Sequence, residues 1–318
     1  MPMSLEEYQV AQMYMVMKMQ QQSTNGDEGV EVLENKRFQD DVFGKGQYTS
    51  KVYRLQSKAP AWLTTIAPKD ALVMQEEAWN AYPRCKTVIK CPYFTKFSLT
   101  IETVHRADNG TSENVHGLNE EQLAARQVEI IDIASAETDY WSYAIRSSSF
   151  DFPKFKSTKS GHGPLLDGWQ VRTLPPSPFS QSRDYIHIWI KLLKASLHLQ
   201  LVMLLADNCR PVMTAYKLVT IDAPYWGFGY RLEQALLAGE RALFIESHRN
   251  CFGWIDEWFG LTMQQIRELE QQGDCLLNEK ISKLVLLTDA ADCEQRFTHS
   301  SERQFYLAYS LQPQIDKD

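Results

Sequence analysis

The sequence predicts an α+β protein in which long helices flank one curved, mainly antiparallel β-sheet. Two observations support this class. Strand-like stretches follow one another through the first half of the chain, and long helical patterns stand at both ends. The 318 residues, of which 44% are hydrophobic, are enough to bury a sizeable core.

Capping boxes mark the start of the first and last predicted helices. Ser4 and Glu7 form one box, which predicts a helix to about residue 22. Thr262 and Gln265 form the second, and the helix that it opens continues to about residue 281. Further helices are predicted near 70–79 and at about 229–249.

Alternating apolar residues and turn residues predict the strands. They lie at about 30–34, 47–55, 85–91, 96–104, 127–133 and 212–221. Residues 23–29 read as a loop between the first helix and the first strand. Residues 151–164 are rich in lysine, serine and glycine and contain two prolines, which predicts a long surface loop.

Charge and composition exclude several classes of protein. The net charge of −7 argues against a general nucleic-acid binder, which would carry a basic stripe. The methionine-rich start is interrupted by Glu6, Glu7 and Gln12 and is therefore no signal peptide. The six cysteines and seven histidines show no metal-binding spacing. We expect a cytoplasmic protein with reduced thiols and without a metal or cofactor.

Residues 172–208 differ in composition from the rest of the chain. A stretch rich in proline and serine precedes the strongly apolar residues 185–206. Lys191 and Lys194 interrupt the apolar run, and a central lysine costs about 2.5–3.5 kcal/mol on membrane-insertion scales. An amphipathic segment lying on a membrane or on the protein is favoured over a spanning helix.

The strand at 47–55 carries an unusual polar face. Its residues at a period of two are Gln47, Thr49, Lys51, Tyr53 and Leu55. Thr49 and Lys51 project to the same side about 7 Å apart. One hydroxyl and one positive charge at this spacing suit a phosphate group, although a solvated strand face has the same pattern.

Similar polar residues interrupt other apolar faces. Gln12 lies in the apolar stripe of the first helix, Glu270 continues that of the last helix, and Thr87, Thr103 and Lys217 occupy apolar faces of strands. Each alone is explained by a backbone hydrogen bond or by a side chain that reaches the rim. Together they indicate an apolar cavity with polar groups at one end. The ligand that fits is a phospholipid, with a long apolar body and an anionic, hydroxyl-rich head.

Five motifs resemble the phosphatidylinositol transfer protein family. They are residues 47–58 (QYTSKVYRLQSK), 78–83 (AWNAYP), 155–157 with 161–165 (FKS and GHGPL), 215–220 (AYKLVT) and 254–258 (WIDEW). The resemblance covers about residues 2–171 and 209–272. It implies a START-like, helix-grip fold, in which a concave sheet and long helices enclose one phospholipid with its headgroup inside.

The resemblance also implies a role for each matching residue. The residues that match inositol-ring contacts are Thr49, Lys51, Asn80 and Glu270. Those that match contacts around the lipid phosphate are Gln12, Thr87, Thr103 and Lys217. Cys85 matches a thiol beside the headgroup.

Other matching positions concern the membrane and regulation. Tyr225 and Trp226 stand where the family often has two tryptophans, and Trp62 and Leu63 belong to a segment that resembles its lipid-exchange loop. We expect these four residues to dock on membranes. Ser157 matches a phosphorylation position of the family.

The chain departs from the family pattern in three places. It lacks the short strand that precedes the position of Pro2, which would leave one sheet edge unpaired. Residues 172–208 have no counterpart, and the tail diverges. We therefore expect a transfer domain over 1–281, interrupted by an atypical insert at about 172–208 and followed by a divergent tail at 282–318.

The function expected from these observations is non-enzymatic exchange of phosphatidylinositol and phosphatidylcholine between membranes by a monomer that touches membranes transiently. Phosphatidic acid and sphingomyelin remain open as the second ligand. The alternative is a lipid-sensing adaptor or membrane-tethering module that binds phospholipid without transferring it. A lipid hydrolase is disfavoured because the sequence has no GxSxG motif.

Overall fold

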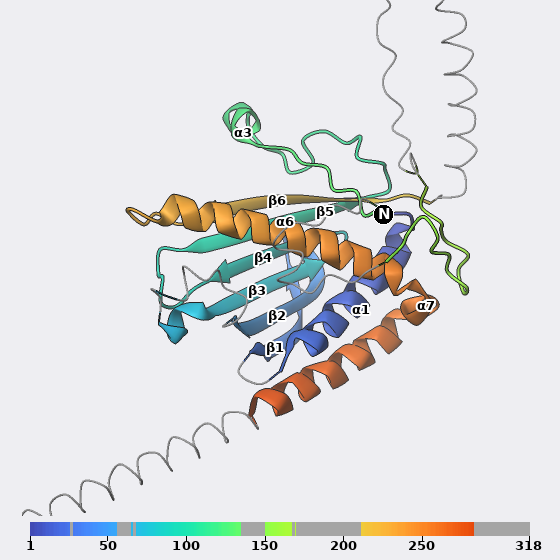
Figure 1. Ribbon diagram of the computed structural model, residues 1–318, viewed down its shortest axis with the longest axis horizontal. Helices are drawn as coiled ribbons and strands as arrows, with labels where there is room; N and C mark the ends of the chain where they lie inside the picture. Colours follow the sequence, from blue (N-terminus) through green and yellow to red (C-terminus); the bar gives the residue numbers. More distant parts are fainter. Residues whose placement is uncertain are drawn as a thin grey trace, which may run out of the picture.

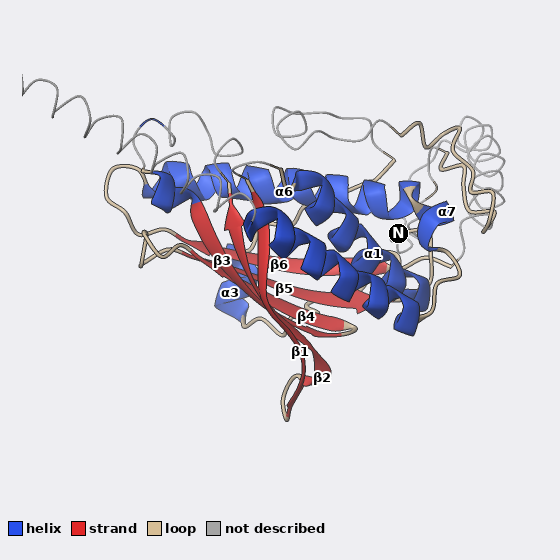
Figure 2. Cartoon of the chain, turned by 90° about the horizontal axis from the view of Figure 1, so that it is seen from below, coloured by secondary structure: helices blue, strands red, loops and turns tan. Residues whose placement is uncertain are grey.

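The computed structural model describes residues 1–25, 28–55, 65, 68–134, 150–166, 169 and 211–282. In this part of the chain one six-stranded antiparallel sheet carries the long helices together on one face, as Figures 1 and 2 show. The predicted α+β class is confirmed. The insert at 172–208, Trp62, Leu63 and the tail from 283 onward lie outside the described residues.

The sheet is a meander, because each strand pairs with the next one along the chain. Its strands are β1 (Gly29–Asp40), β2 (Gly44–Arg54), β3 (Val73–Ala81), β4 (Arg84–Lys90), β5 (Ser98–Arg106) and β6 (Thr214–Asp222). β1 and β2 extend beyond the other strands as a hairpin (Figure 2). In its turn Asp40 Oδ1 accepts hydrogen bonds from the backbone N–H groups of Val42 and Phe43.

The long helices begin as the sequence predicts. They are α1 (Leu5–Ser23), α6 (Gly229–Gly253) and a C-terminal helix at 263–282, with the short α7 (Ile255–Trp258) between the last two. Ser4 Oγ accepts from Glu7 N at 3.1 Å, while Ser4 N donates to Glu7 Oε2 at 2.7 Å. Thr262 and Gln265 form the same reciprocal pair at 2.9 and 3.2 Å. Both predicted capping boxes are therefore present.

Two predictions of secondary structure are wrong. Residues 70–79 form a 3₁₀ turn (Lys69–Leu72) and most of β3 instead of a helix. The run from Met74 to Ala78 consists of good helix formers, but pairing with β2 and β4 on both sides overrides that local preference.

The predicted strand at 127–133 is absent from the described chain, which has the short helix α3 (Glu120–Ala125) just before it. Side-chain hydrogen bonds, rather than pairing with a neighbouring strand, fix the position of this segment. Arg249 of α6 donates to the carbonyl oxygen of Ile133, and Asp132 accepts from the indole N–H of Trp169 at 3.1 Å. Of the apolar residues in this segment Ile133 is buried, whereas Val128 and Ile130 are exposed.

Two apolar clusters stand at opposite ends of the helical layer. One contains Tyr8 of α1, Phe252 of α6, Trp258 of α7 and Phe152 of the 150–166 segment. The second contains the buried residues Leu72, Cys91, Phe97, Leu99, Ala223 and Leu232. Because the clusters fix the helices to the sheet at both ends, the space between them need not be filled by side chains.

The C-terminal helix closes the β1 edge of the sheet. Asn278 donates to the carbonyl oxygen of Val32 and accepts from its N–H group, each at 2.8 Å, so the amide side chain replaces a neighbouring strand at this residue. The helix also packs closely on α1, since a Cβ added to Gly273 would lie 2.9 Å from Gln21 Nε2 and 3.1 Å from Met17 Cγ.

The other edge of the sheet is β6. Among the described residues no strand pairs with its outer side. Just before β6, Met213 and Met1 exchange backbone hydrogen bonds, with Met213 N to Met1 O at 2.9 Å. None of the described helices is both long enough and apolar enough to cross a membrane.

Replacing Asn278 by alanine should destabilise the protein by about 1–3 kcal/mol, because the substitution leaves two backbone groups of Val32 without partners. Urea or guanidinium unfolding measures this loss. Gln272→Ala is the matched control, since Gln272 is an exposed amide on the same helix. Equal unfolding midpoints for the two variants would show that Asn278 does not stabilise the sheet edge.

Candidate functional site

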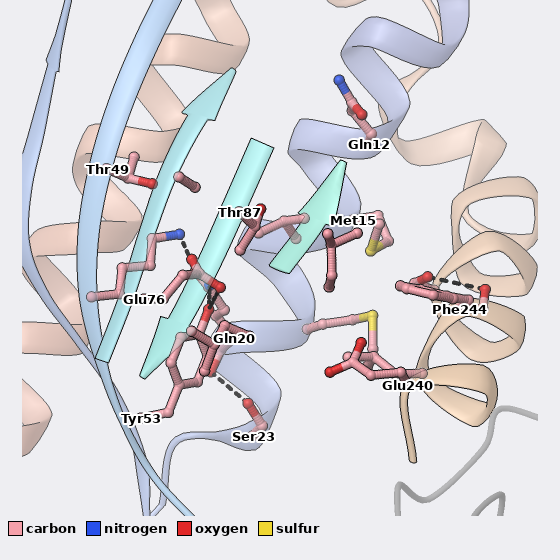
Figure 3. Close-up of a pocket in the computed structure, with 18 of the residues that line it drawn as sticks. Gln12, Met15, Gln20, Ser23, Thr49, Tyr53, Glu76, Thr87, Glu240 and Phe244 are labelled. Atoms are coloured by element: carbon pink, nitrogen blue, oxygen red, sulfur yellow. Dashed lines mark hydrogen bonds between the residues drawn. The ribbon is translucent and has the colours of Figure 1, made fainter. Parts of the chain in front are cut away.

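A cavity of about 910 Å³ lies between the sheet and the helices. Its walls come from α1, α6, the C-terminal helix and strands β2 to β6, and Figure 3 shows a close-up of it. All nine residues predicted to bind the ligand line this one cavity: Gln12, Thr49, Lys51, Asn80, Cys85, Thr87, Thr103, Lys217 and Glu270. Its volume lies at the upper end of the range usual for small-molecule sites.

Strand register places one straight row of polar residues across the cavity wall. Gln47 pairs with Asn80, Asn80 with Cys85, Cys85 with Thr103, and Thr103 with Lys217. Because paired residues on neighbouring strands point to the same face, the five side chains form a continuous polar strip from β2 to β6. We call these five residues the polar row.

The wall becomes more apolar away from the polar row. The next facing row contains Thr49, Ala78, Thr87, Ile101 and Val219 in register. Farther along, the cavity is lined by Leu72, Met74, Ile89, Leu232 and Leu236. The cavity therefore has a polar end and an apolar end, an arrangement that suits an amphipathic ligand.

Several hydrogen-bond donors at the polar end have no partner among the described residues. The hydroxyl groups of Thr49, Thr87 and Thr103 make no hydrogen bond there. Gln12 Nε2 is buried and also lacks a partner. An unpaired buried donor such as Gln12 Nε2 costs about 1–3 kcal/mol, and the three threonine hydroxyls line the same cavity. These donors therefore indicate a ligand that accepts hydrogen bonds.

Lys217 supplies positive charge at the same end. Its ammonium group lies 4.9 Å from the centre of the Phe244 ring and forms no ion pair with the described residues. Burial lowers the pKa of Lys217, while Cys85 and Glu240 oppose that change. A bound anion would stabilise the charged lysine and remove this desolvation penalty.

The histidines beside the polar row are uncharged near neutral pH. Burial lowers the pKa of His105 to about 4 and that of His248 to about 3. His248 Nδ1 lies 2.7 Å from the carbonyl oxygen of Phe244, so it donates there, and Nε2 accepts from the hydroxyl of Tyr8 at 3.0 Å. Both imidazoles are therefore part of the cavity wall and bring no positive charge to it.

Cys85 is a protonated thiol in this setting. Burial raises its pKa to about 11, although the nearby Lys217 opposes that rise. Its Sγ donates to Asn80 Oδ1 at 3.1 Å, which leaves the amide nitrogen of Asn80 available to a ligand. Cys85 thus orients a neighbouring binding residue.

A chain of hydrogen bonds surrounds Lys51. Lys51 Nζ donates to Gln20 Oε1 at 3.3 Å, Gln20 Nε2 donates to the Tyr53 hydroxyl at 3.1 Å, and that hydroxyl donates to Glu76 Oε2 at 3.1 Å (Figure 3). The contact of Lys51 is long and involves a neutral partner. The ammonium group therefore remains able to bind an anionic or hydroxylated ligand.

Further polar residues that the sequence did not indicate line the cavity, among them Gln20, Glu240 and Asp274. Gln20 lies eight residues after Gln12, and Asp274 lies four residues after Glu270, so both continue known helix faces. Glu240 on α6 gave no such signal. Burial raises the pKa of Glu240 to about 7, and its Oε2 accepts no hydrogen bond from the described residues.

The two predicted docking aromatics lie in different environments. Trp226 is 99% exposed, whereas Tyr225 is half-buried. The Tyr225 ring stacks on Phe228 at 5.4 Å, and its hydroxyl accepts from Lys96 N at 3.0 Å. Tyr225 is therefore packed against the protein, while the neighbouring Trp226 is exposed.

Ser157 is buried in this conformation. It is 2% exposed and donates to Asp256 Oδ1. The same carboxylate accepts from the backbone N–H groups of Thr158 and Lys159 at 3.0 and 3.1 Å. Modification of Ser157 would thus require the 150–166 segment to separate from α7.

Comparisons with known proteins agree with this geometry. The family model described as "Phosphatidylinositol transfer protein" matches residues 1–274. "Phosphatidylinositol transfer protein 1" of Dictyostelium discoideum is 36% identical over 284 residues, which are 89% of this chain and 93% of that protein. "Phosphatidylinositol transfer protein beta isoform" of Homo sapiens is 38% identical over 272 residues, or 85% of this chain and 88% of that protein.

A third relative is much longer than this chain. "Protein retinal degeneration B" of Drosophila melanogaster is 36% identical over 289 residues, which are 88% of this chain and 20% of that protein. The family match spans α1, all six strands, α6 and α7, and thus the elements that build the cavity. This chain belongs to the phosphatidylinositol transfer protein family.

Proposed function

We propose that this protein carries phosphatidylinositol between membranes, with the headgroup at the polar end of the cavity and the acyl chains at the apolar end. The observation that carries the proposal is the group of unpartnered donors, Gln12, Thr49, Thr87 and Thr103, beside the unpaired Lys217. Membership of the family and the names of its relatives support the choice of lipid.

The lipid phosphate would lie against the polar row. Lys217 provides the charge, and Thr87, Thr103 and Gln12 provide neutral donors around it. An anion in this position would give these donors an acceptor, including the buried Gln12 Nε2. Binding energy comes from these contacts and needs no covalent step.

The inositol ring would lie nearer β2 and the C-terminal helix. Thr49 and Lys51 donate to ring oxygens, while Asn80 donates through its amide nitrogen. Glu270 accepts from ring hydroxyls and is held by Arg267 at 2.6 Å. A ring with several hydroxyls can satisfy donors and acceptors together, whereas a choline group cannot.

The apolar end would hold the acyl chains. Burial contributes about 0.8 kcal/mol per CH₂ group, and the bilayer provides the same contribution. Because these terms nearly cancel, extraction and return are reversible. The headgroup contacts then decide which lipid is preferred.

Phosphatidylcholine is the second cargo that we propose. Its phosphate can use the same contacts at Lys217 and the polar row, and only the ring contacts are lost. Phosphatidic acid and sphingomyelin carry a phosphate too, so transfer assays should include both lipids.

The protein would act without enzymatic chemistry. Ser247 Oγ lies 3.3 Å from His248 Nδ1, but that nitrogen already donates to Phe244 O. It cannot serve as a base for Ser247 in this arrangement. The high pKa of Cys85 likewise disfavours a thiolate nucleophile.

A lipid-holding adaptor is the second candidate. The observation that favours it comes from the sequence: the apolar insert at 172–208 would anchor the chain at one membrane. A carrier moves labelled lipid between vesicles, whereas an adaptor binds lipid without moving it. Comparing the full chain with a version lacking 172–208 separates the two.

We also propose that Trp226, together with Trp62 and Leu63, inserts into the membrane surface while cargo is exchanged. Trp226 and Tyr230 are 99% and 74% exposed, and interfacial aromatic rings are well suited to this position. The protein would be a cytoplasmic monomer that contacts membranes transiently. Phosphorylation at Ser157, once exposed, would regulate this cycle.

Thr49→Glu should abolish phosphatidylinositol transfer and spare phosphatidylcholine transfer, because the new carboxylate would lie against the inositol ring and the phosphate. Transfer of each labelled lipid between liposomes by the purified variant measures this. Gln75→Glu is the control, since it adds the same charge at an exposed site on β3. Equal loss of both lipids in Thr49→Glu would contradict the assignment of Thr49 to the ring.

Trp226→Ala should weaken binding to vesicles roughly tenfold, which corresponds to about 1.4 kcal/mol of lost apolar burial. Vesicle co-sedimentation measures the binding, and the ratio of the two transferred lipids should stay unchanged. Val42→Ala is the control, because Val42 is 86% exposed at the β1–β2 turn. A changed lipid ratio would place the Trp226 ring inside the cavity instead.

A further inference from the structure

A second carboxylate reaches the headgroup end of the cavity beside Glu270. Asp274 lies one helical turn after Glu270 on the same helix face, and both side chains line the cavity. The sequence analysis does not include Asp274 among the binding residues, and its environment differs from that of Glu270. Glu270 is paired with Arg267 at 2.6 Å, whereas Asp274 forms no ion pair with the described residues.

The position of Asp274 is fixed by a relay of two amide side chains. Gln47 Nε2 donates to Asn35 Oδ1 at 2.6 Å, and Asn35 Nδ2 donates to Asp274 Oδ2 at 2.7 Å. Gln47 belongs to the polar row, and Asn35 pairs in register with Thr49. The relay therefore connects the C-terminal helix through β1 to β2, the strand that carries the proposed ring contacts Thr49 and Lys51.

One oxygen of this carboxylate is left for a ligand. Oδ2 accepts from Asn35, whereas Oδ1 accepts no hydrogen bond from the described residues. Burial raises the pKa of Asp274; Asn35 and Lys51 oppose that rise, and Glu270 adds to it. Lys51 and Glu270 both affect the pKa of Asp274, so its carboxylate interacts electrostatically with two of the proposed ring contacts.

A half-buried carboxylate oxygen without a donor is best satisfied by a hydroxyl group of the cargo. A polyol ring presents O–H donors in several directions, while a choline headgroup presents none. The hydrogen bond would involve a charged acceptor and would therefore be among the stronger ones in the site.

We propose that Asp274 is a specificity-determining residue of this chain, whose free oxygen accepts a hydrogen bond from a hydroxyl of a polyol headgroup, and that Asn35 is its positioning residue. The inference rests on the proposed function and deepens it, because it assigns a further selective contact to the same site. It predicts that removing Asp274 changes which lipid is carried more than how much lipid is carried.

Asp274→Ala tests this directly. The ratio of phosphatidylinositol to phosphatidylcholine transfer between liposomes should fall about tenfold or more, which is the usual effect of losing a hydrogen bond to a charged group. Asn35→Ala should lower the same ratio to a smaller extent, because Asp274 keeps its charge and loses only its orientation. Glu279→Ala, which removes an exposed carboxylate from the same helix, should leave the ratio unchanged.

Asp274→Asn preserves the size of the side chain, so it separates loss of the ligand contact from a folding defect caused by lost packing. It should also lower the ratio, because its single oxygen accepts from Asn35 and the free position then carries an NH2 group, which cannot accept from a cargo hydroxyl. An unchanged ratio in Asp274→Ala or in Asp274→Asn would overturn the inference while the wild-type chain still transfers phosphatidylinositol. Failure of the wild-type chain to bind or transfer phosphatidylinositol would instead refute the proposed function, and the inference with it.

Discussion

Strand register is the constraint on which the rest of this structure depends. Antiparallel pairing places Gln47, Asn80, Cys85, Thr103 and Lys217 side by side on five strands, although the first and the last are 170 residues apart in the sequence. A shift of one residue in any strand would turn its side chains to the other face of the sheet. The polar row therefore exists only because all four pairings hold at once, and the buried Lys217 within it has no ion-pair partner in the described part of the chain.

The helices complete what the sheet begins. Two apolar clusters fix them at the ends, so the middle of the layer can stay open as a cavity. The C-terminal helix has two roles in this arrangement: Asn278 covers the edge of β1, and Glu270 and Asp274 face the cavity. The closed sheet edge and the two carboxylates that line the cavity therefore depend on the same packing of one helix against β1 and α1.

The site could be predicted from the sequence further than the fold could. Each of the nine residues predicted to bind the ligand interrupts an apolar pattern or matches a family motif, and all nine line one cavity. The helix predicted at 70–79 failed because Glu76, Glu77 and Ala78 favour helices locally, while pairing with two neighbouring strands decides the outcome. Asp274 could have been found from its place one turn after Glu270, whereas Glu240 could not, because carboxylates on amphipathic helices ordinarily face solvent and only tertiary packing turns it inward.

The central claim is that the polar row holds the phosphate of a bound phospholipid. Native mass spectrometry of the purified full chain, beside Lys217→Met, tests it most directly. The account predicts one phospholipid per wild-type chain and little or none in Lys217→Met, which keeps the apolar stem of the side chain and removes only the charge. A wild-type chain without lipid, or equal lipid content in both proteins, would contradict it.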